Sequence, residues 1–366
     1  MIDYILGLNV LDMSFIWGYG YKYPQSIHSR LAYAKGQNMI KGAMCNGVDQ
    51  LLSMYKLTIV VAIYNVENYL KKCLDSLADQ TSDDYEVFCV NDGSTDKSRD
   101  IILSYLDNKK FKLLDKTNGG LSDARNYGIE RCNSKYISFI DGDDFVENNY
   151  VETIINTLDK DKSDMMVFSY NQYYLANGSK ELVGLRINDG IYSLKDKKEL
   201  LAYTPNAAWN KAYKTSLFKD NEIFYPYGYR HQDMGTTPKL LLKAKSISYV
   251  DKPLYNYLID RPNNITAQLD KKLYHIIDMA KEVMDYYISE NCFDEYVDEF
   301  AYLIKRNFIQ SLRKSMKLQD KKFVYQFIDD IFDVEDKYFK NSKDIYHVNE
   351  EKGDDVYLSR IKCKLY

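Results

Sequence analysis

Apolar runs alternate with helix-like patterns from residue 57 onward. The segment "LTIVVAIY" (57–64) is continuous and rich in β-branched residues, which is typical of a strand buried on both faces of a sheet. Apolar residues then recur at i, i+3 and i+4 through residue 77, which predicts a helix with Asn65 as its candidate N-terminal cap. Further strands at 85–90, 111–115 and 136–140 are separated by helical patterns. This βαβαβαβ order predicts an α/β fold with a mostly parallel open sheet.

The alternation weakens after another apolar run at 165–170. Residues 171–206 have the glycines and polar residues of hairpins and loops, whereas 207–218 and 231–245 return to helical spacing. Residues 246–257 are predicted to be extended, and 270–340 to be helical. We therefore divide the chain into an N-terminal extension (1–54), an α/β domain (55–270) and a helical C-terminal region (271–366).

Composition narrows the function classes. The formal net charge of the 366 residues is −4 and no block of lysine or arginine stands out, which argues against a nucleic-acid partner. None of the six cysteines lies in a CxxC pair, so we expect reduced thiols and a cytoplasmic location, with peripheral binding at the inner membrane face as an option.

The first 23 residues are apolar, but Asp3 and Asp12 interrupt them, and they lack the basic start of a signal peptide. Our hypothesis is that residues 1–53 are dispensable and that translation from Met54 gives an active protein. Loss of activity in that shorter chain would contradict the hypothesis.

Each of the first four predicted strands ends in polar or small residues. These ends are Tyr64-Asn65, "NDGS" (91–94), "NGG" (118–120) and "DGDD" (141–144). Ligands of open α/β sheets bind where the strands end, so four such ends suggest one extended polar ligand. The aspartates of "DGDD" suit Mg²⁺ or Mn²⁺, which takes one or two carboxylates together with substrate phosphates. The alternative for Asp143 or Asp144 is to cap the following helix.

Five ordered segments closely resemble the family 2 glycosyltransferases, which are inverting enzymes with the GT-A fold. They are "TIVVAIYNVENYLKKCLDSLADQT", "VNDGSTDKSRDI", "NGGLSDARNYGIERC", "YISFIDGDDFV" and, further along, "WNKAYKTSLF" with "HQDM". The likeness covers roughly residues 57–265 and is specific for the family, not for the sugar. It implies a nucleotide-binding half (55–165) and an acceptor half (166–270).

The resemblance assigns donor-binding roles residue by residue. Asp92 matches the aspartate that accepts a hydrogen bond from uracil, and Asp143 matches the residue that binds the metal bridging the two phosphates of a UDP-sugar. Asp141 is expected to reach either the ribose or that metal. Gly142 is the small residue that admits the diphosphate. Arg261, with Asn263 and Asn264, resembles the loop that closes over the diphosphate. The remaining residues expected along the nucleotide are Ile63, Tyr64, Asn65, Glu67, Gly120 and Arg125. A structural ion pair is the alternative for Arg125.

The resemblance also places a base at the acceptor side. Asp233 in "RHQDMG" matches the catalytic aspartate that takes the proton of the acceptor hydroxyl. A helix N-terminus should stabilise this carboxylate as the anion; a plain helix cap is the alternative. Gln232 stands where the family usually has glutamate. Trp209 resembles an aromatic residue that stacks on a sugar, with a core tryptophan as the alternative, and His231 is a candidate acceptor contact.

The sequence therefore predicts metal-dependent inverting transfer, with Mn²⁺ or Mg²⁺, from a nucleoside diphosphate sugar to a glycan or lipid-linked acceptor in bacterial surface polysaccharide synthesis. One alternative is a nucleotidylyltransferase-like enzyme, which would need a glycine-rich phosphate loop that "AIYNVENY" lacks. Another is a non-catalytic nucleotide-sugar-binding module, which would be expected to lose Asp143 or Asp233. The C-terminal helices are candidates for peripheral membrane or homodimer contact.

Overall fold

The computed structural model describes residues 55–185, 187–261, 269–318 and 320–343. The chain from Tyr55 onward forms one compact unit. The predicted extension over residues 1–54, the loop residues Asn263 and Asn264, and the last residues of the C-terminal region lie outside the described residues.

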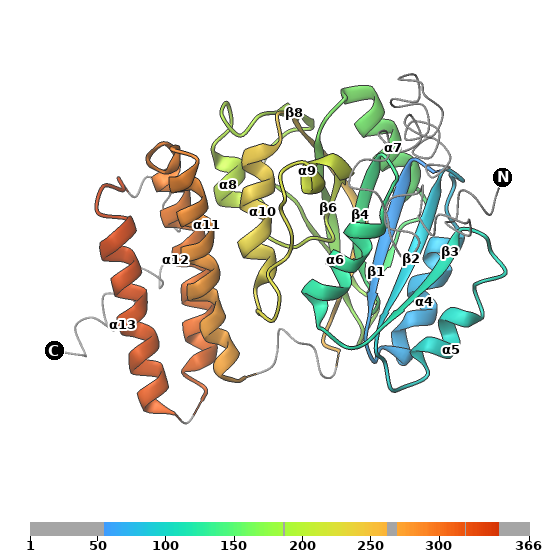
Figure 1. Cartoon of the computed structure of the whole chain (residues 1–366), viewed down its shortest axis with the longest axis horizontal. Coiled ribbons are helices and arrows are strands. Elements are labelled where there is room, and N and C mark those ends of the chain that lie inside the picture. The colour runs from blue at the N-terminus through green and yellow to red at the C-terminus, as the bar shows by residue number, and fades with distance from the viewer. Residues whose placement is uncertain (1–54, 186, 262–268, 319, 344–366) are drawn as a thin grey trace, which may run out of the picture. The chain divides into compact units, whose positions relative to one another are not determined.

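The first half of the described chain builds parallel strands, as its pattern predicts (Figure 1). The strands β1 (Leu57–Ile63), β2 (Tyr85–Asp92), β3 (Phe111–Lys116) and β4 (Tyr136–Asp141) pair in the order β3-β2-β1-β4. Every pair among them is parallel. Side chains of β1 alternate between two apolar cores, with Val60 in one and Ile59 and Val61 in the other. This explains why the strand reads as a continuous apolar run.

The sheet continues into the second half through an antiparallel strand. β9 (Lys211–Lys214) lies between β4 and β6 (Met165–Tyr174) and is antiparallel to both. β10 (Ile247–Ile259) pairs in parallel with β6, and its pairing register shifts between Val250 and Tyr255. The strands β5 (Phe145–Val146), β7 (Lys180–Val183) and β8 (Gly190–Tyr192) complete the ten-stranded sheet by antiparallel pairing.

The predicted helix over 207–218 is wrong for its central part. Residues 211–214 are strand β9, and the short helix α9 (Thr215–Lys219) begins only at its end. The segment fills the gap between β4 and β6, where the sheet supplies hydrogen bonds on both sides. Tertiary pairing therefore overrides the local helical spacing.

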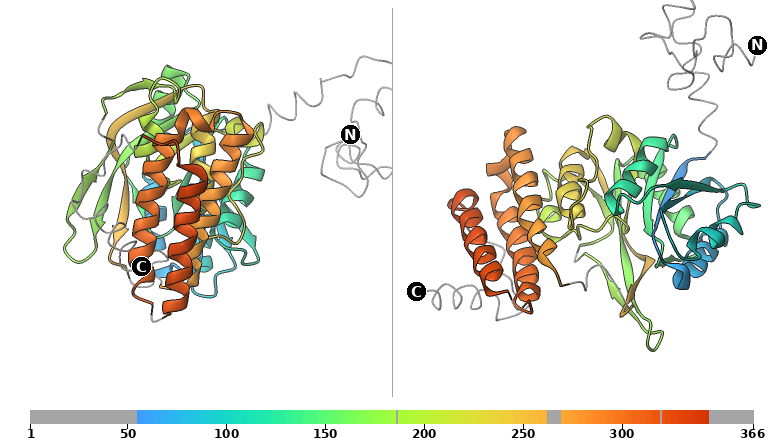
Figure 2. Two further views of the ribbon diagram at one scale, coloured as in Figure 1. Left: turned by 90° about the vertical axis from the view of Figure 1, so that its left-hand side faces the viewer. Right: turned by 60° about the horizontal axis from the view of Figure 1, so that its bottom comes forward.

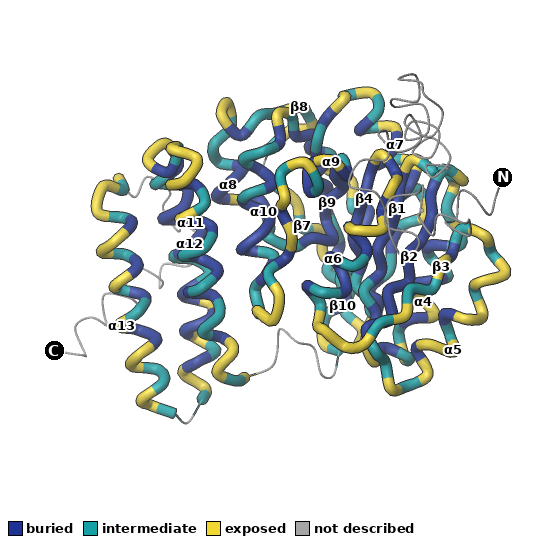
Figure 3. The backbone as a smooth tube through the Cα atoms, in the orientation of Figure 1, coloured by how far each residue is buried: buried dark blue, intermediate teal, exposed yellow. Residues whose placement is uncertain are grey.

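Helices cover both faces of the sheet. Residues of α4 (Glu67–Ala78) and α7 (Tyr150–Asp161) join one core, and residues of α6 (Leu121–Arg131) and α10 (Gln232–Lys243) join the other. Figure 3 shows the strands as the most buried layer between them. Two shorter helices lie in the connections between strands: α5 (Ser98–Leu103) and α8 (Glu199–Tyr203). Asn65 does not cap α4, because Val66 occupies the cap position and the Asn65 carboxamide bonds elsewhere.

Three longer helices follow the sheet and extend its second core. They are α11 (His275–Ser289), α12 (Val297–Ser315) and α13 (Lys321–Tyr338); the 3-10 turn η2 (Lys271–Tyr274) precedes α11, and η3 (Phe293–Tyr296) precedes α12. Their apolar side chains join the core that contains α10, and Figure 2 shows them as a layer beside α10. Among the described helices, none combines the length and apolar character that crossing a bilayer requires.

Candidate active site

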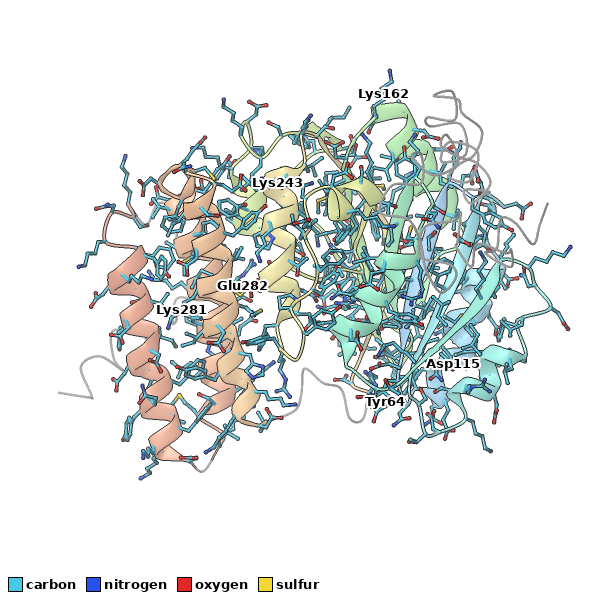
Figure 4. The ribbon with its side chains drawn as sticks, viewed as in Figure 1. Tyr64, Asp115, Lys162, Lys243, Lys281 and Glu282 are labelled. Carbon is cyan, nitrogen blue, oxygen red and sulfur yellow. The ribbon has the colours of Figure 1, made fainter. Side chains whose placement is uncertain are left out.

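The carboxyl ends of the parallel strands form one edge of the sheet. The pairing register places Ala62 of β1 opposite both Val90 of β2 and Asp141 of β4. Figure 4 shows two residues at this edge: Tyr64, which follows β1, and Asp115, which lies in β3. The polar residues after each strand are therefore brought together, as expected for an open α/β sheet.

Asp92 is held at the end of β2 by three donors. Its Oδ1 accepts from Lys116 Nζ at 2.6 Å and from the Gly119 backbone N–H at 2.9 Å. Its Oδ2 accepts from the Gly120 N–H at 2.8 Å. A carboxylate offers about four acceptor positions, so one is left for a ligand. Gly120 has a φ of +89°, and nothing lies within 4 Å of where a Cβ would stand, so the surface beside Asp92 is open.

The segment after β1 is hydrogen-bonded to the loop that follows β2. The Asn65 Oδ1 accepts from the Thr95 N–H at 2.8 Å, with Asn65 in the left-handed region at φ 51°. The Glu67 carboxylate accepts from the Lys97 N–H at 2.7 Å. Tyr64 is exposed and Ile63 is buried in the core, so of these predicted nucleotide contacts only Tyr64 presents a largely free side chain.

Arg125 of α6 connects two predicted functional aspartates. Its Nη2 donates to Asp141 Oδ1 at 2.9 Å and its Nη1 to Asp233 Oδ1 at 2.5 Å. The guanidinium is 1% exposed and lies 5.2 Å from the ring centre of Tyr225. Burial opposes its charge, yet the carboxylates of Asp233 and Asp141 raise its pKa above the ordinary value. Arg125 thus forms structural ion pairs, which is the alternative that the sequence left open. Its two ion pairs join the end of β4 to the start of α10.

Asp233 lies inside the first turn of α10. The cap position belongs to His231, which makes no side-chain capping bond, so the plain-cap alternative for Asp233 is wrong. The net shift in its pKa is opposite in direction to the one expected from the helix end alone. Burial raises the pKa of Asp233, while Arg125 works in the opposite direction. Its Oδ1 is bound to Arg125, and the side chain remains 23% exposed.

The aspartates of "DGDD" separate into different environments. Asp144 is buried and accepts from Tyr255 Oη at 2.6 Å and from the Leu258 N–H at 2.7 Å, so it fastens β10 to the end of β4. Neither Asp143 nor Asp144 caps a helix, because the two-residue strand β5 follows them. Asp143 forms an ion pair with Arg261. Burial, and then the charge of Asp141, raises the pKa of Asp143 to about 6.

These carboxylates fit a divalent cation bound together with a ligand. Burial disfavours the Asp143 anion, and the like charge of Asp141 adds to that effect against the opposing charge of Arg261. Within the described residues there is no group of at least three His, Cys, Asp or Glu side chains arranged as a complete metal site. Mg²⁺ and Mn²⁺ commonly take only one or two protein carboxylates and complete their shell with phosphate and water oxygens.

Gly142 is packed closely against the end of β1. A Cβ at this residue would lie 3.1 Å from the Ala62 carbonyl oxygen and 3.2 Å from Ile63 and Val66 side-chain carbons. The close approach lets the Gly142 N–H donate to the Ala62 oxygen at 3.1 Å. The glycine therefore keeps the acidic turn against β1, a reason that differs from the predicted room for a diphosphate.

The structure does not support the predicted acceptor role of Trp209. Its indole is 8% exposed and stacks on Tyr255 and Tyr257, with ring centres 4.6 and 5.1 Å apart. Tyr170 contacts it edge-on at 4.6 Å. Because tyrosine rings occupy the stacking positions, Trp209 is a core residue, which is the alternative that the sequence left open.

Gln232 and His231 also offer little side-chain surface to an acceptor. Gln232 is 7% exposed, and the His231 Nε2 atom is buried without a hydrogen-bond partner among the described residues. Burial, and then the charges of Lys314, Arg230 and His275, lower the pKa of His231 to about 4. His231 has a φ of 64° and sets the entry of the chain into α10.

Other residues at this edge were missed by the sequence argument. Tyr227 and Tyr229 are exposed in the loop before α10. Lys211 is buried and donates to three oxygens at 2.5–2.6 Å, those of Pro205, Ala207 and Asn210. Burial lowers the pKa of Lys211 to about 7, but three acceptors match the three donors of the protonated amine. The stretch "YPYGY" (225–229) directly before "RHQD" was the available signal for the aromatic residues.

The fold is that of a known solved structure. Residues 1–349 of TarS from S. aureus, crystallised with UDP-GlcNAc, superpose with a TM-score of 0.63 at 22% identity, covering 76% of this chain and 80% of that one. Together with the flanking helices and the acidic strand ends, this similarity defines a GT-A fold. The profile of glycosyl transferase family 2 matches residues 58–221, so this part of the chain is similar to that family.

Curated relatives cover part of the chain. It is 32% identical to the glycosyltransferase GlyA of Streptococcus pneumoniae over 237 residues, 62% of this chain and 34% of GlyA. It is also 32% identical to the poly(ribitol-phosphate) β-glucosyltransferase of Bacillus spizizenii over 214 residues, 56% of this chain and 32% of that protein. The chain thus spans about a third of the length of each.

A second profile, that of glycosyl hydrolase family 9, matches residues 1–99. The described part of this match, from residue 55, contains β1, α4, β2 and the start of α5. The strands β1 and β2 belong to the same sheet as the strands in the rest of the glycosyltransferase match. The described structure therefore assigns them to the GT-A fold.

Proposed function

We propose that the protein transfers a sugar from a UDP-sugar to a hydroxyl group of a glycan or lipid-linked acceptor, with inversion at the anomeric carbon. The observation that carries this proposal is the double ion pair of Arg125. It places Asp141, at the donor end of β4, and Asp233, at the start of α10, on one buried guanidinium. The match of residues 58–221 to the family 2 profile and the names of the relatives support the class of reaction.

The donor would lie along the carboxyl ends of the strands. The free acceptor position of Asp92 suits the uracil imide, and exposed Tyr64 and open Gly120 border the same space. Asp143 and Asp141 would hold Mn²⁺ or Mg²⁺, which, when bound, supplies a Lewis acid that neutralises charge on the diphosphate. Arg261, next to Asp143, is placed to stabilise the leaving group as its charge grows.

The transfer step needs one proton acceptor. The acceptor oxygen forms a bond to the anomeric carbon while the bond from that carbon to the diphosphate oxygen breaks and its electron pair leaves with UDP. The hydroxyl proton passes to Asp233 Oδ2, because Oδ1 is engaged with Arg125. Arg125 thereby orients the base and keeps it close to the donor.

The donor class is tested with a panel of nucleotide sugars and Mn²⁺, measuring nucleotide release and thermal stabilisation of the protein. We expect UDP and at least one UDP-sugar to raise the melting temperature, and that UDP-sugar to give UDP release when an acceptor is present. If no uridine nucleotide stabilised the protein, the proposed donor class would be overturned.

Asp143→Ala should lower transfer by about 10²–10³-fold, the usual effect of removing one group that stabilises developing charge. The reason is loss of the carboxylate that faces Asp141 and Arg261 at the diphosphate position. The measurement is stabilisation by UDP with and without Mn²⁺. We expect the metal-dependent part to vanish in the variant, while the melting temperature without ligands changes little. Unchanged dependence on Mn²⁺ would remove Asp143 from the metal site.

The pH profile of kcat should show an acid limb with an apparent pKa above the ordinary aspartate value of about 3.9. The base must be the anion, and burial raises the pKa of Asp233, so its protonation begins at a higher pH than for an exposed aspartate. The profile is measured at saturating donor and metal, with UDP affinity recorded over the same range. A limb at or below about pH 3.9 would contradict the assignment.

A further inference from the structure

Lys211 is a buried cation whose side chain lies on the same side of the sheet as α10. The residue is 0% exposed and begins strand β9. Successive side chains of a strand point to opposite faces, so Lys211 shares a face with Tyr213. Tyr213 packs into the core that also contains Met234 and Leu240 of α10. A charge is buried at low cost only where it is paired or hydrogen-bonded, so the partners of this ammonium indicate its role.

The Lys211 ammonium holds a connection without regular secondary structure. Residues 205–207, between α8 and β9, form neither helix nor strand, and we call them the α8–β9 loop. Nζ donates to the carbonyl oxygens of Pro205 at 2.5 Å and Ala207 at 2.6 Å. Its third hydrogen bond, of 2.6 Å, is to Oδ1 of neighbouring Asn210. Two of the three carbonyls in the loop are therefore fixed by one side chain of β9.

The carbonyl between those two is held by α10. Thr237 Oγ1 donates to the Asn206 carbonyl oxygen at 2.6 Å, and Thr237 is fully buried. Thr237 lies four residues after Asp233, so both side chains are on the same face of α10. Figure 1 shows α8, which leads into the loop, beside α10. The α8–β9 loop thus connects the ammonium of Lys211 to the helix that carries the proposed base.

The start of α10 depends on contacts from other elements, because Pro238 lies within the helix. Proline has no N–H, so the carbonyl of Met234 lacks the hydrogen bond that residue 238 would otherwise donate. The first turn is therefore joined to the rest of α10 by fewer backbone bonds than usual. Arg125 of α6 binds Asp233, and the α8–β9 loop binds Thr237. These two contacts fix the direction of the turn.

We propose that Lys211 is a positioning residue, which holds the α8–β9 loop against Thr237 and so fixes the first turn of α10 and the place of Asp233. The inference rests on the proposed function, in which Asp233 is the base. Lys211 is buried and acts through the loop, whereas Arg125 binds the carboxylate directly. The charge of Lys211 has the same consequence: burial raises the pKa of Asp233, and the cations Arg125 and Lys211 oppose that shift and favour the anion.

The first test replaces Thr237, which leaves Lys211 and its charge in place. Thr237→Val removes the hydroxyl at nearly constant volume and should lower kcat by about 10–10²-fold, the effect of a small misplacement of a catalytic group. Thr237→Ser keeps the hydroxyl and should restore most of the activity. UDP affinity should stay at the wild-type value in both variants, because the donor residues are untouched. Expressing kcat per UDP-binding site excludes a loss of folded protein as the cause.

Thr236→Val is the matched control on the neighbouring residue. Thr236 is equally buried, but its hydroxyl donates to the Gln232 carbonyl inside α10 at 2.9 Å. The same chemical change therefore leaves the α8–β9 loop attached, and kcat should remain at the wild-type level. An equal loss in Thr236→Val would show that the interior of α10 is what matters, and not its link to the loop, which would refute the proposal.

A double-mutant cycle joins Lys211 to Thr237. Lys211→Met removes the three donors and should also lower kcat without loss of UDP affinity. Once the loop is released, Thr237→Val should have little further effect, so the two losses should be less than additive. If Lys211→Met does not fold, Lys211→Gln, which keeps two donors, replaces it in the cycle. Additive losses would refute the link through the loop.

Hydrogen exchange tests the link without reference to activity. Lys211→Met and Thr237→Val should speed the exchange of the amides of residues 232–237, compared with those of α7 in the same samples. Unchanged exchange would refute the link. Faster exchange with wild-type kcat would give Lys211 a purely structural role and refute the positioning of Asp233. A wild-type protein that binds UDP but transfers no sugar would instead count against the proposed function, while hydrogen exchange would still decide the link.

Discussion

Asp233→Asn should reduce transfer by about 10²–10⁴-fold, the range for loss of a general base, while UDP affinity stays unchanged. Asparagine keeps the size of the side chain and can still accept from Arg125 through its carbonyl oxygen. It cannot take the proton of the acceptor hydroxyl, because its other terminal atom is an amide nitrogen. The measurement is UDP release at saturating donor, combined with calorimetric titration of UDP.

The matched control is Asp100→Asn, which makes the same chemical change in the first turn of α5, at an exposed position. We expect wild-type turnover from it. Near-normal turnover in Asp233→Asn would show that another group takes the proton. A parallel loss of UDP affinity would instead indicate that Asp233 shapes the donor site through Arg125.

Arg125→Met should destabilise the fold by about 3–5 kcal/mol, the usual cost of removing one partner from a buried ion pair, and should also abolish transfer. Methionine fills most of the space but leaves Asp141 and Asp233 without their shared counter-charge. Urea unfolding gives the change in free energy, and UDP release gives the activity. Because the two carboxylates would then repel each other, the stability loss should shrink as pH falls and they become protonated.

Arg131→Met provides the control on the same helix. Arg131 is exposed and pairs with neighbouring Glu130 at 3.4 Å, so its loss should cost no more than about 1 kcal/mol. Arg125→Lys keeps one charge but lacks the forked geometry that reaches two carboxylates. We expect it to recover much of the stability and little of the activity. If it restored full activity, Arg125 would act only through its charge.

Much of the sheet edge was predictable because its residues follow local rules. The β1, β2 and β4 strands are continuous apolar runs that end abruptly in polar residues, and parallel pairing must place such ends together. The convergence of Asp92, Asp141 and Asp143 on one edge follows from that topology. The placement of Asp233 near them depended on the resemblance to a family, since it comes from a helix far along the chain.

The remaining features depend on contacts that no local pattern encodes. The strand β9 forms because β4 and β6 offer hydrogen bonds on both sides, although residues 207–218 have helical spacing. Trp209 is buried because β10 brings Tyr255 and Tyr257 against it. The direction of the shift in the pKa of Asp233 likewise follows from burial between elements, against the opposing charge of Arg125.

The insertion of β9 has a mechanical consequence. Lys214 pairs with Tyr136 and Tyr213 with Met165, so a single strand is hydrogen-bonded to both the first and the second half of the sheet. Opening the molecule between those halves would break this ladder, which makes a hinge there energetically costly. The sheet from β3 to β10 should consequently melt in one cooperative calorimetric transition.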